Sequence, residues 1–175
     1  YTGEAGYEFY CAAANGIKLY NLLLAAGKDL GAEPAGLGAR DTLRFEACMP
    51  LYGNDIDDTT TPFDAGLGWI VKLDKGDFLG HEALARQQAE GPKRRLVGFA
   101  MTGRGIARHG YPIWRGDKQV GVVTSGSHAP SLNRALGMGY VPVDLAAVGT
   151  VIDIEIRGQK VAAEIVGMPF YRRAK

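Results

Sequence analysis

The chain has 175 residues, 46% of them hydrophobic and 22% charged, which fits one ordinary globular domain or two small ones. It contains no apolar run of about 18 residues, so the sequence predicts no membrane-spanning segment. Cys11 and Cys48 show neither the spacing of a metal site nor a disulfide framework, and a reduced compartment is expected.

Charge is distributed unevenly along the chain, although the net charge is only +1. Residues 1–90 hold 14 acidic and 7 basic side chains, whereas residues 91–175 hold 5 acidic and 13 basic ones. A Gly-Pro break followed by a basic run, residues 91–95, separates the two parts. We therefore predict two domains, residues 1–91 and residues 92–175.

The first part mixes helices with isolated strands. A glycine-flanked turn carrying Glu4 precedes an alternating strand that contains Glu8. Helical periodicity, glycine stops and proline breaks then predict the remaining elements. They are a strand at 7–11, a packing helix at 17–26, a helix from 38 that ends before Pro50, a strand at 67–73 and a helix from 77 to about 90.

The helix that begins at Gly38 carries an unusual density of charge. Leu43 and Ala47 are expected to face the core. Arg44 can pair with Asp41 as a surface ion pair, and Arg40 opposes the helix dipole in the first turn. Either Arg40 is one more solvated charge, or it points into a cleft and binds a ligand.

Glu4 and Glu8 also have two interpretations. Each can be a solvent-facing carboxylate, which the spacing alone favours. A carboxylate on ordered backbone can alternatively accept two adjacent N–H donors of a ligand. The aspartates at 55, 57 and 58 lack the glycine and glutamate positions of a calcium loop, so no metal site is predicted.

The second part is predicted to be all β. Short strands about ten residues apart indicate a small antiparallel barrel or sandwich. The strands are expected at 96–101, 113–115, 119–124, 136–141, 151–156 and 161–166. The basic residues are not interleaved with aromatic ones, so a nucleic-acid-binding surface is not expected.

An ordered set of motifs resembles one enzyme family over essentially the whole chain. Five of them suffice to show the order: Tyr-Thr-Gly-Glu at 1–4, Gly-Leu-Gly-Ala-Arg-Asp-Thr-Leu-Arg at 36–44, Met-Pro-Leu-Tyr-Gly-Asn-Asp-Ile at 49–56, Gly-Leu-Gly-Trp at 66–69 and Pro-Phe-Tyr at 169–171. Together they resemble the T-proteins of the glycine cleavage system, which are tetrahydrofolate-dependent aminomethyltransferases.

The resemblance implies both a fold and a set of site residues. The fold class is α+β: the C-terminal part of a folate-binding α+β domain, followed by a small antiparallel β-barrel. Tetrahydrofolate is the implied acceptor, and the residues that match family folate positions are Glu4, Glu8, Arg40, Trp69 and Tyr171. The motif does not say which glutamate holds the pterin.

The resemblance also implies what the chain lacks. The family's catalytic aspartate lies upstream of Tyr-Thr-Gly-Glu, so no catalytic residue is expected within these 175 residues. About half of the usual protein is then missing, and we expect the chain alone to be inactive or nearly so. A folate-binding tail of a sarcosine or dimethylglycine dehydrogenase, or a folate-binding module without catalysis, are the alternatives.

The implied partner is a lipoylated H-protein, with no nucleic acid and no membrane. H-proteins are acidic as a family, so the basic second part could steer docking through Arg94, Arg104 or Arg108, or could simply be solvated. The expected location is the cytoplasm, or the mitochondrial matrix in a eukaryote.

Overall fold

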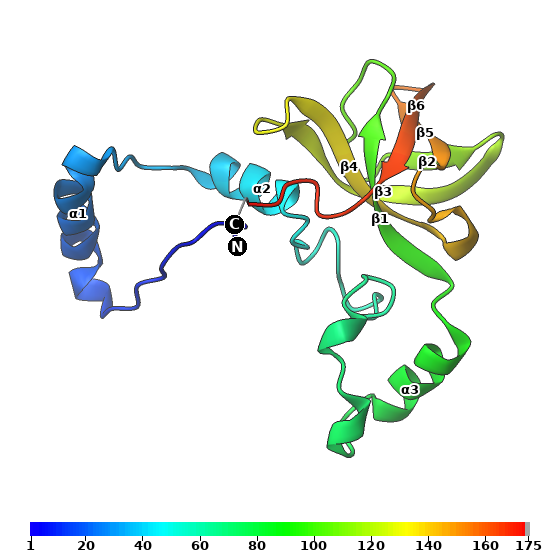
Figure 1. The fold of residues 1–175 in the computed structure, drawn as a ribbon, viewed down its shortest axis with the longest axis horizontal. Coiled ribbons are helices and arrows are strands. Elements are labelled where there is room, and N and C mark those ends of the chain that lie inside the picture. The colour runs from blue at the N-terminus through cyan, green and yellow to red at the C-terminus, as the bar shows by residue number, and fades with distance from the viewer. Residues whose placement is uncertain (174–175) are drawn as a thin grey trace.

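The computed structural model describes residues 1–173 and consists of a six-stranded barrel with extended helical segments beside it (Figure 1). Three α-helices precede the strands in the chain. They are α1 (Gly16–Gly27), α2 (Leu37–Glu46) and α3 (His81–Glu90). Across the described residues, none of the helices has the length and apolarity needed to cross a membrane.

The barrel is antiparallel and closed. Its strands are β1 (Arg94–Met101), β2 (Pro112–Arg115), β3 (Lys118–Ala129), β4 (Arg134–Pro142), β5 (Val151–Ile156) and β6 (Gln159–Val166). Their order around the barrel is β1-β4-β3-β2-β5-β6, and pairing of Phe99 with Ile165 joins β6 back to β1. The α+β class and the antiparallel barrel are confirmed.

Two apolar clusters hold this part together. One fills the barrel interior, and its largest members include Phe99, Ile113 and Ile154. The other lies on the outer face of the barrel, where Phe45 of α2 packs with Leu96 of β1 and with Leu136 and Met138 of β4. Strand β1 is therefore covered on both faces, and α2 is attached to the barrel by the burial of Phe45.

The two strands predicted in the first part were wrong. Residues 7–11 form no regular secondary structure, and the Tyr7 side chain is 91% exposed. In place of a strand at 67–73 there are short 3-10 turns, Gly68–Ile70 and Leu73–Lys75. Both segments show a strand-like pattern of side chains, but a strand is stabilised only by pairing with another, and neither pairs with a strand in the described part of the chain.

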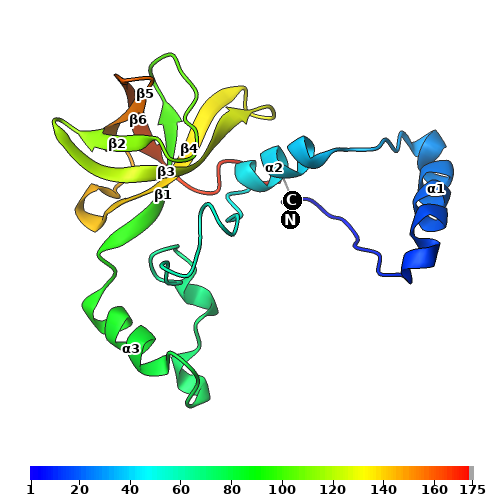
Figure 2. The same ribbon diagram turned by 180° about the vertical axis from the view of Figure 1, so that it is seen from behind.

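The arrangement in space separates the helices from the barrel. Helices α1 and α3 extend away from it, and α2 lies between α1 and the barrel (Figures 1 and 2). Helix α1 was predicted as a packing helix, but it has no buried residue. The N- and C-terminal segments lie close together beside α2 (Figure 1). The boundary at residues 91–95 falls between α3 and β1, and the division into two domains stays a prediction.

Candidate functional site

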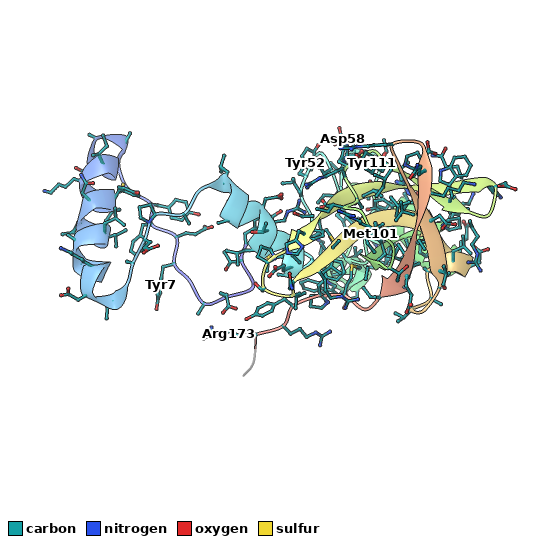
Figure 3. The ribbon with its side chains drawn as sticks, turned by 90° about the horizontal axis from the view of Figure 1, so that it is seen from above. Tyr7, Tyr52, Asp58, Met101, Tyr111 and Arg173 are labelled. Atoms are coloured by element: carbon teal, nitrogen blue, oxygen red, sulfur yellow. The ribbon has the colours of Figure 1, made fainter. Side chains whose placement is uncertain are left out.

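The N-terminal segment and α2 form one polar cavity of about 390 Å³. It is lined by Tyr1, Thr2, Glu4, Gly6, Tyr7, Glu8 and Arg40. Three of the five residues singled out from the sequence, Glu4, Glu8 and Arg40, therefore lie around the same space. Figure 3 shows Tyr7 on the extended N-terminal segment that leads to α1.

Arg40 is held over an aromatic ring. Its guanidinium carbon lies 4.4 Å from the centroid of the Tyr1 ring. The Tyr1 hydroxyl donates a hydrogen bond of 2.7 Å to the Pro50 carbonyl, which fixes the ring. Stacking of this kind stabilises by about 0.5–1 kcal/mol at exposed sites and leaves the guanidinium N–H groups free to bind a ligand. No pattern in the sequence indicated a role for Tyr1, which contributes through this stacking.

The two glutamates have different partners. The Glu8 carboxylate accepts a 2.8 Å hydrogen bond from the hydroxyl of Tyr10, two residues along the chain. Glu4 accepts a 2.7 Å bond from the Tyr171 hydroxyl and lies 3.3 Å from the Arg173 guanidinium. Hydrogen bonding to Glu4 raises the pKa of Tyr171, because the carboxylate favours the neutral, donating phenol. Tyr171 is thus brought to the edge of the cavity.

Trp69 is not brought there. Its side chain is 73% exposed on the 3-10 turn Gly68–Ile70, and it does not line the cavity. The exposed indole is free to contact a ligand or another surface. Its role as a folate contact stays a prediction.

A buried polar network lies at the C-terminal end of α2. Arg44 donates to Asp55 at 2.7 Å and to the Ser125 hydroxyl at 3.1 Å, and both side chains of the ion pair are almost fully buried. Thr124 and Ser125 of β3 both donate to the Asp55 carboxylate. This network connects α2 and the following turn to the barrel.

The observed contacts of α2 differ from those predicted for this helix. Arg44 does pair with Asp41, but it is 3% exposed and not a surface residue. The core is contacted by Phe45, whereas Leu43, predicted to be buried, is 36% exposed. Helical spacing alone could not show that the barrel would cover the Arg44 face, because the covering strand is about 80 residues away in sequence.

A second cavity, of about 610 Å³, lies between α3 and the loop that contains Asp64, and none of its lining residues in the described chain is aromatic. A third, of about 400 Å³, lies against β3 and β4, and Tyr140, His109, Arg94 and a single carboxylate, Asp57, are among its lining residues. Within residues 1–173, His, Cys, Asp and Glu side chains do not gather in groups of three or more that could hold a metal ion. The cavity at Tyr1 combines carboxylates, an arginine and aromatic rings, which is a set suited to a heterocycle with N–H donors.

Two protein-family models match the chain. The "GCVT N-terminal domain" matches residues 1–75, and the "Glycine cleavage T-protein C-terminal barrel domain" matches residues 94–172. The second match coincides with the six-stranded barrel. Together the two models account for most of the chain.

Individual relatives agree with these models. The chain is 53% identical over 170 residues to an aminomethyltransferase of Halothermothrix orenii, covering 97% of this chain and 48% of the relative. It is 50% identical to an aminomethyltransferase of Geobacillus kaustophilus, covering 100% of this chain and 48% of the relative. The crystal structure of glycine cleavage system aminomethyltransferase T from Bartonella henselae superposes with a TM-score of 0.85 at 38% identity, covering 93% of this chain and 46% of that one. The chain thus spans about half the length of the relatives it matches.

Proposed function

Since this chain belongs to the glycine cleavage T-protein family, we propose that it serves aminomethyl transfer to tetrahydrofolate. In this reaction the aminomethyl carbon leaves the lipoyl arm of an H-protein and joins tetrahydrofolate as 5,10-methylenetetrahydrofolate. Ammonia and the dihydrolipoyl arm are the other products. The named relatives are aminomethyltransferases, which gives the dehydrogenase-tail alternative no support.

The observation that supports the proposal is that the Glu8 carboxylate and the ring-stacked Arg40 line a single cavity. A pterin presents a ring N–H and an amino group side by side, and a carboxylate accepts both donors at once. Arg40 supplies donors to the acceptor atoms of the same ligand. Tetrahydrofolate supplies the two nitrogens that take up the carbon, and the residues of this chain bind and orient it.

A titration of the 175-residue chain with tetrahydrofolate tests this proposal, for instance by isothermal calorimetry. We expect saturable binding that is roughly 10- to 100-fold weaker in Glu8→Gln and in Arg40→Met, since each loses charge-assisted hydrogen bonds worth about 1.5–3 kcal/mol. Arg86→Met, an exposed arginine on α3, is the matched control and should bind as the wild type does. Equal affinity of all four proteins would contradict the proposed site.

We also propose lipoylated H-protein as the partner, docking on the basic second part. Residues 91–175 carry 13 basic and 5 acidic side chains, a balance that suits steering of an acidic protein. Arg104 is the cleanest position for a test, because Arg94 is tied to Thr59 and Asp64, and Arg108 to Gly126. Association measured by surface plasmon resonance should slow with added salt and in Arg104→Glu, and salt-independent association would contradict steering. The cytoplasm of a bacterium is the proposed location.

A further inference from the structure

The last described residues form a strap, residues 167–173, that leaves the barrel after β6 and runs to the N-terminal segment. Its first anchor is the Phe170 ring, whose centroid lies 5.5 Å from that of Phe45 on α2. The ring also covers Gly98 of β1, where an added Cβ would lie 2.5 Å from a Phe170 ring carbon. The Tyr171 amide then donates a 2.8 Å hydrogen bond to the Glu46 carbonyl at the end of α2. The strap is therefore seated on the barrel and α2 before it reaches the cavity.

After these contacts with the barrel and α2, the strap contacts both oxygens of the Glu4 carboxylate. The Tyr171 hydroxyl donates to Glu4 Oε1 at 2.7 Å, and the Arg173 guanidinium lies 3.3 Å from Glu4 Oε2. Tyr171 and Glu4 are separated by 167 residues, so this contact connects the two ends of the described chain. Figure 3 shows Arg173 on the strap beside α2.

We propose that Glu4 is the latch of this strap and a positioning residue, which acts on the cavity by holding Tyr171 and Arg173 at its edge. The inference rests on the proposed function and assigns a role to one of the two glutamates of that site. One Glu4 oxygen accepts from Tyr171 and the other is paired with Arg173, so the carboxylate cannot offer both as a free pair to two adjacent ligand donors without releasing Tyr171 or Arg173. Glu8 has no such engagement with a distant segment, because its hydrogen-bond partner in the described chain is Tyr10.

Replacing Glu4 with glutamine distinguishes two roles of its carboxylate, holding the strap or binding the ligand. In Glu4→Gln the amide oxygen can still accept the hydrogen bond from the Tyr171 hydroxyl. The variant loses only the exposed ion pair with Arg173, which contributes little to stability. A glutamine that replaces a ligand carboxylate instead presents an NH₂ group to ligand donors. Glu4→Gln should therefore bind tetrahydrofolate within about twofold of the wild type, whereas Glu8→Gln should lose roughly tenfold or more.

Hydrogen exchange of the strap gives a readout that needs no ligand. The Tyr171 amide is hydrogen-bonded to Glu46, so its exchange reports directly whether the strap is seated. We expect exchange of a 167–173 peptide to accelerate by roughly 3- to 10-fold in Glu4→Ala and in Tyr171→Phe, since each removes the same hydrogen bond. Glu4→Gln and Glu8→Gln should exchange as the wild type does. Because the two changes break one contact, the double variant Glu4→Ala/Tyr171→Phe should be no faster than Glu4→Ala.

The outcomes separate the latch from the proposed function. Strap exchange that stays at the wild-type rate in Glu4→Ala would overturn the latch. Loss of tetrahydrofolate affinity in Glu4→Gln equal to that in Glu8→Gln, with the strap still seated, would also overturn it and make Glu4 a ligand carboxylate. If the wild-type chain does not bind tetrahydrofolate, the proposed function fails, and the exchange measurements still decide whether Glu4 holds the strap.

Discussion

Asp55 joins three parts of the molecule through one buried side chain. Its carboxylate accepts from Arg44 on α2, from the Leu51 amide in the turn and from Thr124 and Ser125 on β3. Its backbone carbonyl accepts a 2.8 Å bond from the Tyr140 hydroxyl. Removing such a group leaves Arg44 as a buried charge without its main partner.

Asp55→Ala should therefore lower the free energy of unfolding by about 3–5 kcal/mol, measured by urea denaturation. Asp117→Ala is the matched control, since its fully exposed carboxylate makes a 3.3 Å pair with Lys160. The control should change stability by no more than about 0.5 kcal/mol. Similar effects of the two substitutions would show that the buried network contributes little.

The buried thiol of Cys48 should make the free energy of unfolding depend on pH in the alkaline range. Burial raises the pKa of its thiol from 9.0 to about 12, because the thiolate is poorly solvated beside the barrel. The folded state therefore holds the proton more tightly than the unfolded state. The contribution of the protonated Cys48 thiol to the free energy of unfolding is fully present below pH 9. It is lost as the pH rises from 9 towards the pKa of the folded state.

The free energy of unfolding should consequently fall by about 2 kcal/mol more in the wild type than in Cys48→Ala when the pH is raised from about 9 to about 10.5. Chemical denaturation at several pH values measures this difference. Parallel pH profiles of the two proteins would contradict the assignment to Cys48.

At the scale of elements, the barrel depends on close contact between β3 and β4. At Gly121 an added Cβ would lie 1.9 Å from the Tyr140 carbonyl oxygen, which belongs to the backbone and cannot rotate away. Gly121→Ala should lower the free energy of unfolding by about 1–3 kcal/mol. Gly167→Ala is the control, because nothing lies within 4 Å of its added Cβ. Near-equal melting temperatures of the two variants would show that the strands can separate at little cost.

Comparing the predicted with the observed helices and strands shows which parts of the fold are encoded by local sequence patterns. All six barrel strands were predicted because alternation of side chains and tight turns are local signals. Most of them extend beyond the predicted bounds, β3 by the most. The strands at 7–11 and 67–73 were wrong because alternation cannot supply a partner strand. In the site, Glu4, Glu8 and Arg40 came from the motif order. The burial of Arg44 and the strap contact of Glu4 depend on residues 81 and 167 positions away, which no local pattern encodes.

At the scale of the whole molecule, stability is concentrated in the barrel. Helix α1 has 12 residues and no buried side chain, and Ile17 is 80% exposed. An isolated helix of this length is marginal in water, because tertiary packing supplies most helical stability. We therefore expect the amides of α1 to exchange with solvent within seconds, while those of β1 and β4 exchange orders of magnitude more slowly. Equal protection of α1 and the barrel in hydrogen-exchange mass spectrometry would contradict this view.

We propose that the cavity beside Tyr1 and Arg40 binds the pterin of tetrahydrofolate. The most direct measurement is an experimental structure of the 175-residue chain with tetrahydrofolate bound. We predict the pterin in this cavity, with its ring N–H and amino group facing the Glu8 carboxylate and with Glu4 still bonded to Tyr171. A pterin bound elsewhere, for example in the cavity between α3 and the loop that contains Asp64, would contradict the proposed binding site.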